Sequence, residues 1–130
     1  MAALLCGCGA TTYPIRGEFG TVPFEGELQV SEPETGQRRY VLDVQSVPEP
    51  WRLRPDAHHY VGWIVSDRRG AFKVATVNYD DLARRARLDE RNNDEGRVFL
   101  VTAEEESWAR EPSRTVLFEV VLWAREDDAR

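Results

Sequence analysis

The sequence contains few of the residues from which active sites are built. Its 130 residues include two histidines, two cysteines and one methionine. There is no Gly-x-Ser-x-Gly elbow to present a nucleophile, and no glycine-rich loop of the kind that holds phosphates or dinucleotides. His58 and His59 are the only candidate bases, and Ser66 is the nearest hydroxyl in sequence. We therefore expect no enzyme activity, no cofactor and no catalytic residues.

The chain also lacks an excess of positive charge and any long apolar run. Its formal net charge is −6, and Lys73 is its only lysine. Proteins that bind nucleic acids need the opposite balance, so we expect no nucleic-acid partner. No apolar stretch reaches the length that a membrane-spanning helix requires.

Both cysteines lie near the start, in the stretch Leu5-Cys6-Gly7-Cys8. A disulfide between cysteines two positions apart would be strained. A thioredoxin-type motif has two residues between its cysteines rather than one. A zinc site would need His58 and His59 as well, and adjacent residues of a strand point to opposite faces. We therefore expect neither a redox pair nor a metal site.

The same stretch resembles a bacterial lipobox, in which a branched apolar residue, a small residue and Gly or Ala precede the lipidated cysteine. Small and polar residues follow Cys8, as expected of a tether. A basic segment and a full apolar segment before the cysteine are missing, so a short tail with two idle thiols is the alternative. We expect lipidation at Cys8, a flexible tether over residues 1–20, and a location in the bacterial cell envelope, facing the periplasm or anchored in the outer membrane.

Alternating apolar and polar residues predict strands along most of the remaining chain. The clearest alternation places Tyr40, Leu42 and Val44 on one face. Residues 59–67 are apolar on both faces, which predicts a central strand, and the turn before Gly70 predicts a hairpin with the next strand. The predicted strands cover residues 26–30, 39–47, 59–67, 71–79, 98–104 and 115–124.

Short strands between turns that contain proline and glycine, with almost no helix, predict an all-β fold. We expect an antiparallel β-sandwich of the Ig-like or Greek-key type with six to eight strands. The sandwich should span residues 21–126, followed by a charged tail over 127–130. Residues 79–88 are ambiguous: they fit either a short helix capped by Asp80 or Asp81, or a loop that leads into a strand at Ala86.

The four tryptophans divide into two pairs. Trp63 and Trp123 lie in apolar strands, and we expect them in the core. Trp51 and Trp108 lie among Pro, Arg and Glu in predicted loops, where an exposed aromatic residue is a credible contact. The binding residues we expect are Trp51, Arg52, Arg54 and Trp108. The alternative is that these loop tryptophans fold back over the end of the sandwich.

An acidic loop at residues 89–96 contains oxygen ligands of the kind that calcium takes. These are Asp89, Asn92, Asn93, Asp94 and Glu95, with Arg91 among them. Their spacing is not that of an EF-hand, and the same residues are typical of a solvated turn. The sequence leaves calcium binding open here.

Several short motifs occur in an order that resembles a known family. They are Pro48 and Pro50, then Tyr60 and Trp63, then residues 101–104 (Val-Thr-Ala-Glu), then Pro112 and Ser113. Residues 24–122 resemble the extracytoplasmic C-terminal domain of anti-sigma-K factors of the RskA type. The resemblance implies a β-sandwich on the outer side of a membrane. It implies no site residues, and the sigma-binding helical domain and membrane helix of that family are not in this sequence.

We therefore expect a non-catalytic envelope domain that acts by binding or in envelope assembly. Its partner would be an envelope protein or another extracytoplasmic molecule, and it would touch the membrane only through a lipid anchor. A regulatory alternative is a separated sensor domain of an anti-sigma-factor system.

Overall fold

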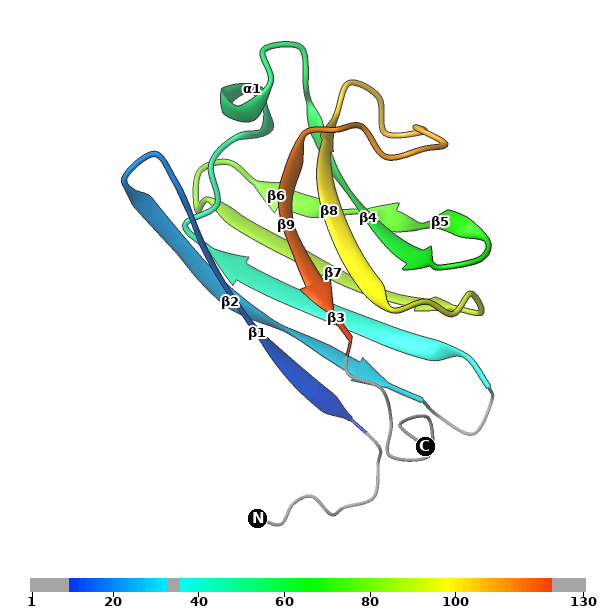
Figure 1. The fold of residues 1–130 in the computed structure, drawn as a ribbon. Helices are drawn as coiled ribbons and strands as arrows, with labels where there is room; N and C mark the ends of the chain where they lie inside the picture. Colours follow the sequence, from blue (N-terminus) through cyan, green and yellow to red (C-terminus); the bar gives the residue numbers. More distant parts are fainter. Residues whose placement is uncertain (1–9, 33–35, 123–130) are drawn as a thin grey trace, which may run out of the picture.

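The computed structural model describes residues 10–32 and 36–122, and within them strands dominate. The elements are β1 (Thr11–Phe19), β2 (Val22–Ser31), β3 (Arg38–Gln45), α1 (Pro50–Leu53), β4 (His59–Ser66), β5 (Gly70–Thr76), β6 (Asn78–Asp80), β7 (Arg85–Asn92), β8 (Val98–Glu104) and β9 (Val116–Val121). They form two antiparallel sheets that pack face to face (Figure 1). The predicted all-β sandwich is confirmed, with nine strands rather than six to eight.

The strand order sets the open edges of the two sheets. The larger sheet has the order β1-β2-β3-β7-β6, and the smaller has the order β5-β4-β8-β9. The chain crosses between the sheets after β3, after β5 and after β7. The central position of residues 59–66 in the smaller sheet is confirmed, because β4 pairs with both β5 and β8.

The prediction of a flexible tether over residues 1–20 is wrong for Thr11–Phe19, which form β1. Tyr13 and Ile15 alternate toward the core and are buried, while their neighbours are exposed. Gly20 and Thr21 form the two-residue turn into β2, and Gly20 has a φ of 64°, a conformation that glycine adopts freely. Residues 1–9 lie outside the described residues, and so do residues 123–130, which include the predicted charged tail.

The predicted hairpin between β4 and β5 is confirmed. Its turn ends at Gly70, whose φ of 84° lies in the left-handed region. The ambiguous segment resolves in favour of the loop: residues 81–84 form a turn, and β7 begins at Arg85. The carboxylate of Asp80 accepts hydrogen bonds from the N–H groups of Leu82 and Ala83, at 3.0 and 3.1 Å, so it stabilises a turn rather than a helix.

The core fills the space between the sheets with side chains from alternating strand positions. Its fully buried members include Leu28, Tyr40, Leu42, Val44, Tyr60, Ile64, Phe99 and Val101. Tyr40 and Phe99 belong to different sheets, and their ring centroids lie 5.5 Å apart. Burial of these large side chains supplies most of the stabilisation of such a fold.

Candidate functional site

Trp51 lies on the only helix among the described residues, the single turn α1. Its side chain is 44% exposed. The segment around it is held from beneath, because Tyr60 donates a hydrogen bond from its hydroxyl to the carbonyl of Pro48 at 2.6 Å. Pro50 is buried and Leu53 is partly buried, so the face of α1 opposite Trp51 lies against the core. Trp51 is therefore displayed by an anchored turn.

The two predicted contact arginines each have an acidic neighbour on the same segment. Arg54 lies 2.7 Å from a carboxylate oxygen of Asp56, and Arg52 lies 3.7 Å from Glu49. The side chain of Arg52 is 53% exposed and that of Arg54 is 35% exposed. The pairs leave this segment accessible and close to electrically neutral, so charge alone would attract few partners.

Trp108 is the more exposed of the two loop tryptophans, at 71%. It lies in the connection between β8 and β9, which covers part of the outer face of the smaller sheet. The carbonyl of Ser107 accepts hydrogen bonds from the Lys73 ammonium and, at 3.1 Å, from the Thr76 hydroxyl. Both donors belong to β5, so the residue before Trp108 is held against the sheet while the indole faces solvent.

A buried polar chain holds the other half of this connection. The Trp63 indole N–H donates to the Thr102 hydroxyl at 2.9 Å, and that hydroxyl donates to the Glu104 carboxylate at 2.5 Å. The same carboxylate oxygen accepts from the backbone N–H of Ser113 at 2.7 Å. Trp63, Thr102 and Glu104 are almost fully buried. The predicted burial of Trp63 is confirmed, but it faces this outer layer rather than the space between the sheets, while Trp123 lies outside the described residues.

The two tryptophan-bearing segments lie at one end of the sandwich, the upper end in Figure 1. The backbone joins them indirectly, because the N–H of His58, which follows α1, donates to the carbonyl of Glu104 at 2.9 Å. The turn between β1 and β2, which exposed Val22 directly follows, and the turn between β6 and β7, which contains exposed Leu82, are also directed away from the chain termini. We refer to Trp51, Arg52, Arg54 and Trp108 as the tryptophan end. The sequence grouped these residues by type, and only the fold places them at one end.

The candidate catalytic residues do not come together. His59 and Ser66 are the first and last residues of β4, about 23 Å apart at the usual rise of a strand. The Ser66 hydroxyl accepts hydrogen bonds from the N–H groups of Arg68 and Arg69, both at 3.3 Å. These side chains therefore cannot form a base–nucleophile pair with each other.

The side-chain oxygens of the acidic loop at residues 89–96 do not converge on a common position for a cation. Asp89 lies on β7 and accepts two hydrogen bonds from the Arg39 guanidinium, at 2.7 and 2.9 Å, which holds the pKa of Asp89 below its usual value. Asn92 accepts a hydrogen bond from the N–H of Asp94 at 2.6 Å, as in a solvated turn. No cluster of three His, Cys, Asp or Glu side chains suited to a metal occurs in residues 10–32 and 36–122.

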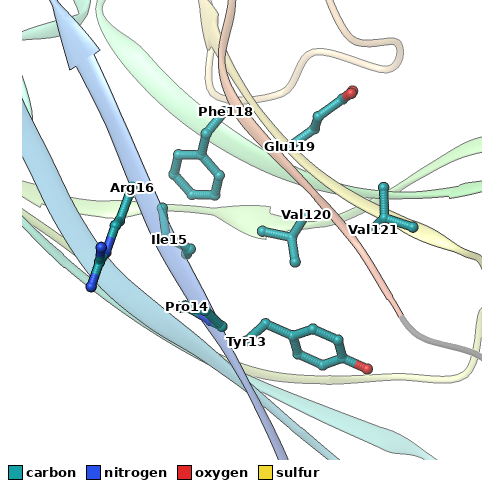
Figure 2. Close-up of a pocket in the computed structure, with 8 residues that line it drawn as sticks. All are labelled: Tyr13, Pro14, Ile15, Arg16, Phe118, Glu119, Val120 and Val121. Carbon is teal, nitrogen blue, oxygen red and sulfur yellow. The ribbon is translucent and has the colours of Figure 1, made fainter.

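A shallow groove of about 310 Å³ lies where the two sheets open beside each other, between β1 and β9. Figure 2 shows Ile15 and Phe118 directed toward each other across it, with Arg16 and Glu119 directed away on either side. Its polar groups do not converge on a common point, so we assign no small-molecule site to it.

Three further findings bear on the identity of the chain. No protein family, no curated protein and no solved structure matches it. In the part of the chain that the structure describes, no helix is long and apolar enough to cross a membrane. Cys8, the predicted lipidation site, lies outside the described residues.

Proposed function

We propose that this protein is a non-catalytic binding domain of the bacterial cell envelope, held to a membrane through a lipid on Cys8. In this proposal the tryptophan end binds an envelope protein or another extracytoplasmic partner. The observation that carries the proposal is the display of Trp51 and Trp108 on two anchored segments at one end of a rigid sandwich. Ordered, exposed tryptophans are typical of binding hot spots, because a large rigid side chain gains contact area with little loss of entropy.

The position of the first strand supports this orientation. β1 begins at Thr11, so two residues, Gly9 and Ala10, separate it from Cys8. The start of β1 and the tryptophan end lie at opposite ends of the sandwich (Figure 1). A lipid on Cys8 would therefore hold the domain close to the membrane, with the tryptophan end directed away from the bilayer and toward a partner.

A regulatory alternative rests on the resemblance to anti-sigma-K factors. Tyr60, Trp63, Thr102 and Glu104, which carry part of that resemblance, are buried residues of the sandwich and its outer polar chain. Such residues specify a fold rather than a partner. The alternative predicts binding to the extracytoplasmic part of a membrane-bound regulator, whereas the main proposal does not require one.

The first test is the intact mass of the protein purified from a bacterial membrane fraction, expressed with its native upstream DNA. A chain that begins at Cys8 and carries diacylglyceryl and acyl groups supports the anchor. An unmodified chain in the cytosol overturns it.

The second test concerns the tryptophan end itself. Trp51→Ala and Trp108→Ala should each reduce recovery of the same partner from chemically cross-linked envelopes, with unchanged melting of the domain. Arg87→Ala on the outer face of the larger sheet is the matched surface control. Equal recovery with all three variants would contradict the assignment of this end.

A further inference from the structure

The four edge strands of the sandwich differ in how well they are protected against pairing with another strand. β6 has three residues, β1 contains Pro14 with Arg16 and Glu18, and β5 contains Lys73 and pairs irregularly with β4. Short length, proline, lysine and bulges are the usual protections of an edge. β9 (Val-Leu-Phe-Glu-Val-Val) contains no proline, lysine or arginine, and Glu119 is its only charge.

The hydrogen bonds of β9 show which of its backbone groups are left over. The Leu122 N–H donates to the carbonyl of Arg97 on the β8 side at 2.7 Å. Residues of an antiparallel strand alternate in direction, so Phe118 and Val120 also face β8. Within residues 10–32 and 36–122, β8 is the only strand that pairs with β9, so Glu119 and Val121 present their N–H and C=O groups on the edge that these residues leave free. The side chain of Val121 is 61% exposed there.

An irregularity in the pairing limits the part of β9 that can accept a strand. The register shifts between Val101 and Thr102, which pair with Phe118 and Val116, so the extra residue lies at the beginning of β9. Regular geometry runs from Phe118 to Leu122. This short segment ends beside the groove between β1 and β9, whose lining includes the apolar side chains of Phe118 and Val120.

We propose that the free edge of β9 pairs antiparallel with the β9 edge of a second copy of this chain. In a two-fold pair, facing residues must share both side-chain face and hydrogen-bond direction, so the sum of their numbers is even. A centre at Glu119 would place two carboxylates directly opposite each other, which is unfavourable. A centre at Phe118 would run through the irregular start of the strand.

A centre at Val121 would pair only Val120, Val121 and Leu122 of the regular segment. The register that uses the whole segment from Phe118 to Leu122 is centred on Val120. It places Val120 opposite the partner's Val120, and Phe118 opposite the partner's Leu122, all on the face directed toward the core. Glu119 then exchanges backbone hydrogen bonds with the partner's Val121, and the two smaller sheets join into one. Because the pairing is antiparallel, the tryptophan ends of the two copies point in opposite directions. The starts of β1 point in opposite directions as well, and β1 begins three residues after Cys8. If the proposed function holds, a lipid on Cys8 therefore anchors one copy of the pair in a given membrane, and the two tryptophan ends bind partners on opposite sides.

The test measures the mass of the full chain by sedimentation over about 10 to 500 µM, a range in which small interfaces dissociate. We expect a monomer–dimer equilibrium in the wild type. Val121→Pro removes an N–H that β8 does not use, and should give a monomer at every concentration. Val121→Thr keeps the N–H and similar shape, and should still dimerise. A monomeric wild type, or a Val121→Pro variant that dimerises equally well, overturns the proposal.

Disulfide trapping tests the register even if the proline variant does not fold. The background for this test is the chain with Cys6→Ser and Cys8→Ser. In this background, a protein with Glu119→Cys is mixed with a protein with Val121→Cys and mildly oxidised, which should give a disulfide-linked heterodimer. The yield should be several-fold higher than in the control mixture of Val22→Cys with Val121→Cys. Equal trapping in the two mixtures contradicts the register. Both readouts are independent of any partner, so they can succeed or fail separately from the proposed function.

Discussion

The carboxylate of Glu104 accepts a hydrogen bond from the backbone N–H of Ser113, 2.7 Å away. This contact closes the connection between β8 and β9 on itself, and Trp108 lies within the closed loop. The same carboxylate is 5% exposed and also accepts from Thr102, so it links the loop to the sheet beneath it. The exposed tryptophan therefore depends on a buried acid for its position.

Glu104→Gln should destabilise the domain by about 1–3 kcal/mol. Both contacts are accepted by one carboxylate oxygen, and the neutral amide oxygen that replaces it accepts hydrogen bonds more weakly. The measurement is the free energy of unfolding from urea titration at neutral pH. Glu105→Gln, at the exposed neighbouring position, is the control and should leave stability unchanged. A variant at position 104 as stable as the control would show that the carboxylate does not hold the loop.

Tyr60→Phe should cost about 1–3 kcal/mol, because it leaves the carbonyl of Pro48 without its buried donor. Tyr79→Phe is the matched comparison, since the Tyr79 hydroxyl donates to the carbonyl of Val47 at the same distance of 2.6 Å. Its effect should be smaller, because Tyr79 is only partly buried and the Arg84 guanidinium also reaches the Val47 carbonyl, at 3.5 Å. Urea unfolding of the two variants measures the difference, and the reverse order would contradict this account.

Stability should fall at alkaline pH as tyrosines of the unfolded chain ionise. Burial raises the pKa of Tyr79 to about 12 and that of Tyr60 further still. Above a pH of about 10 the unfolded chain therefore loses protons that the folded chain retains, which favours unfolding. Urea midpoints between pH 9 and pH 12 should decline less steeply in Tyr79→Phe than in the wild type. Parallel declines would show that Tyr79 ionises equally in both states.

The exposed ion pairs of the larger sheet should be visible in carboxylate titrations. Arg85 donates two hydrogen bonds to Asp43, at 2.7 and 2.9 Å, and holds its pKa below the usual value; Arg39 does the same for Asp89. NMR titration of side-chain carboxylates should show the pKa of Asp43 rising in Arg85→Gln while that of Asp89 is unchanged, with the converse in Arg39→Gln. Folding lowers the pKa of each of these aspartates. Each pair therefore stabilises the protein at pH values above the pKa of the aspartate in the unfolded chain. That stabilisation is lost as the pH falls through the pKa of the aspartate in the folded protein.

Substitutions of the buried and of the exposed tryptophan should differ sharply in their effect on the free energy of unfolding. Trp63→Ala removes a fully buried side chain that donates to Thr102, and should cost about 3–5 kcal/mol. Trp108→Ala should change stability by less than about 0.5 kcal/mol, as is usual for an exposed position. Thermal and urea unfolding measure both. If Trp108→Ala unfolds the domain, Trp108 packs against the fold and is not a displayed contact.

The strands that the sequence predicted correctly are those whose alternation is strongest. Tyr40, Leu42 and Val44 alternate without interruption, and all three are buried. β1 has the same signal in Tyr13 and Ile15, but Pro14 between them and the small residues before them favoured a tether. An edge strand tolerates proline because one side of its backbone needs no partner. That exception could have been recognised from the pattern.

Other features had no signal in the sequence. The polar chain from Trp63 to Glu104 depends on two outward-facing positions of β8 lying beneath a loop that returns over them. In the sequence alone, Thr102 and Glu104 look like ordinary solvent-facing polar residues of a strand, because nothing local indicates that the connection between β8 and β9 covers them. The short β6 has too few residues for any periodicity.

The sequence by itself determined the class of fold, the two faces of the longer strands and the residues available for contact, because these follow from the order of apolar and polar side chains along the chain. Only the tertiary structure decided which loops meet at one end, which edge strand is left unprotected and which acid is buried. Those properties depend on strands distant in sequence becoming neighbours, as in the pairings of β3 with β7 and of β4 with β8. Such pairings are set by packing between the two sheets, and no local pattern encodes them.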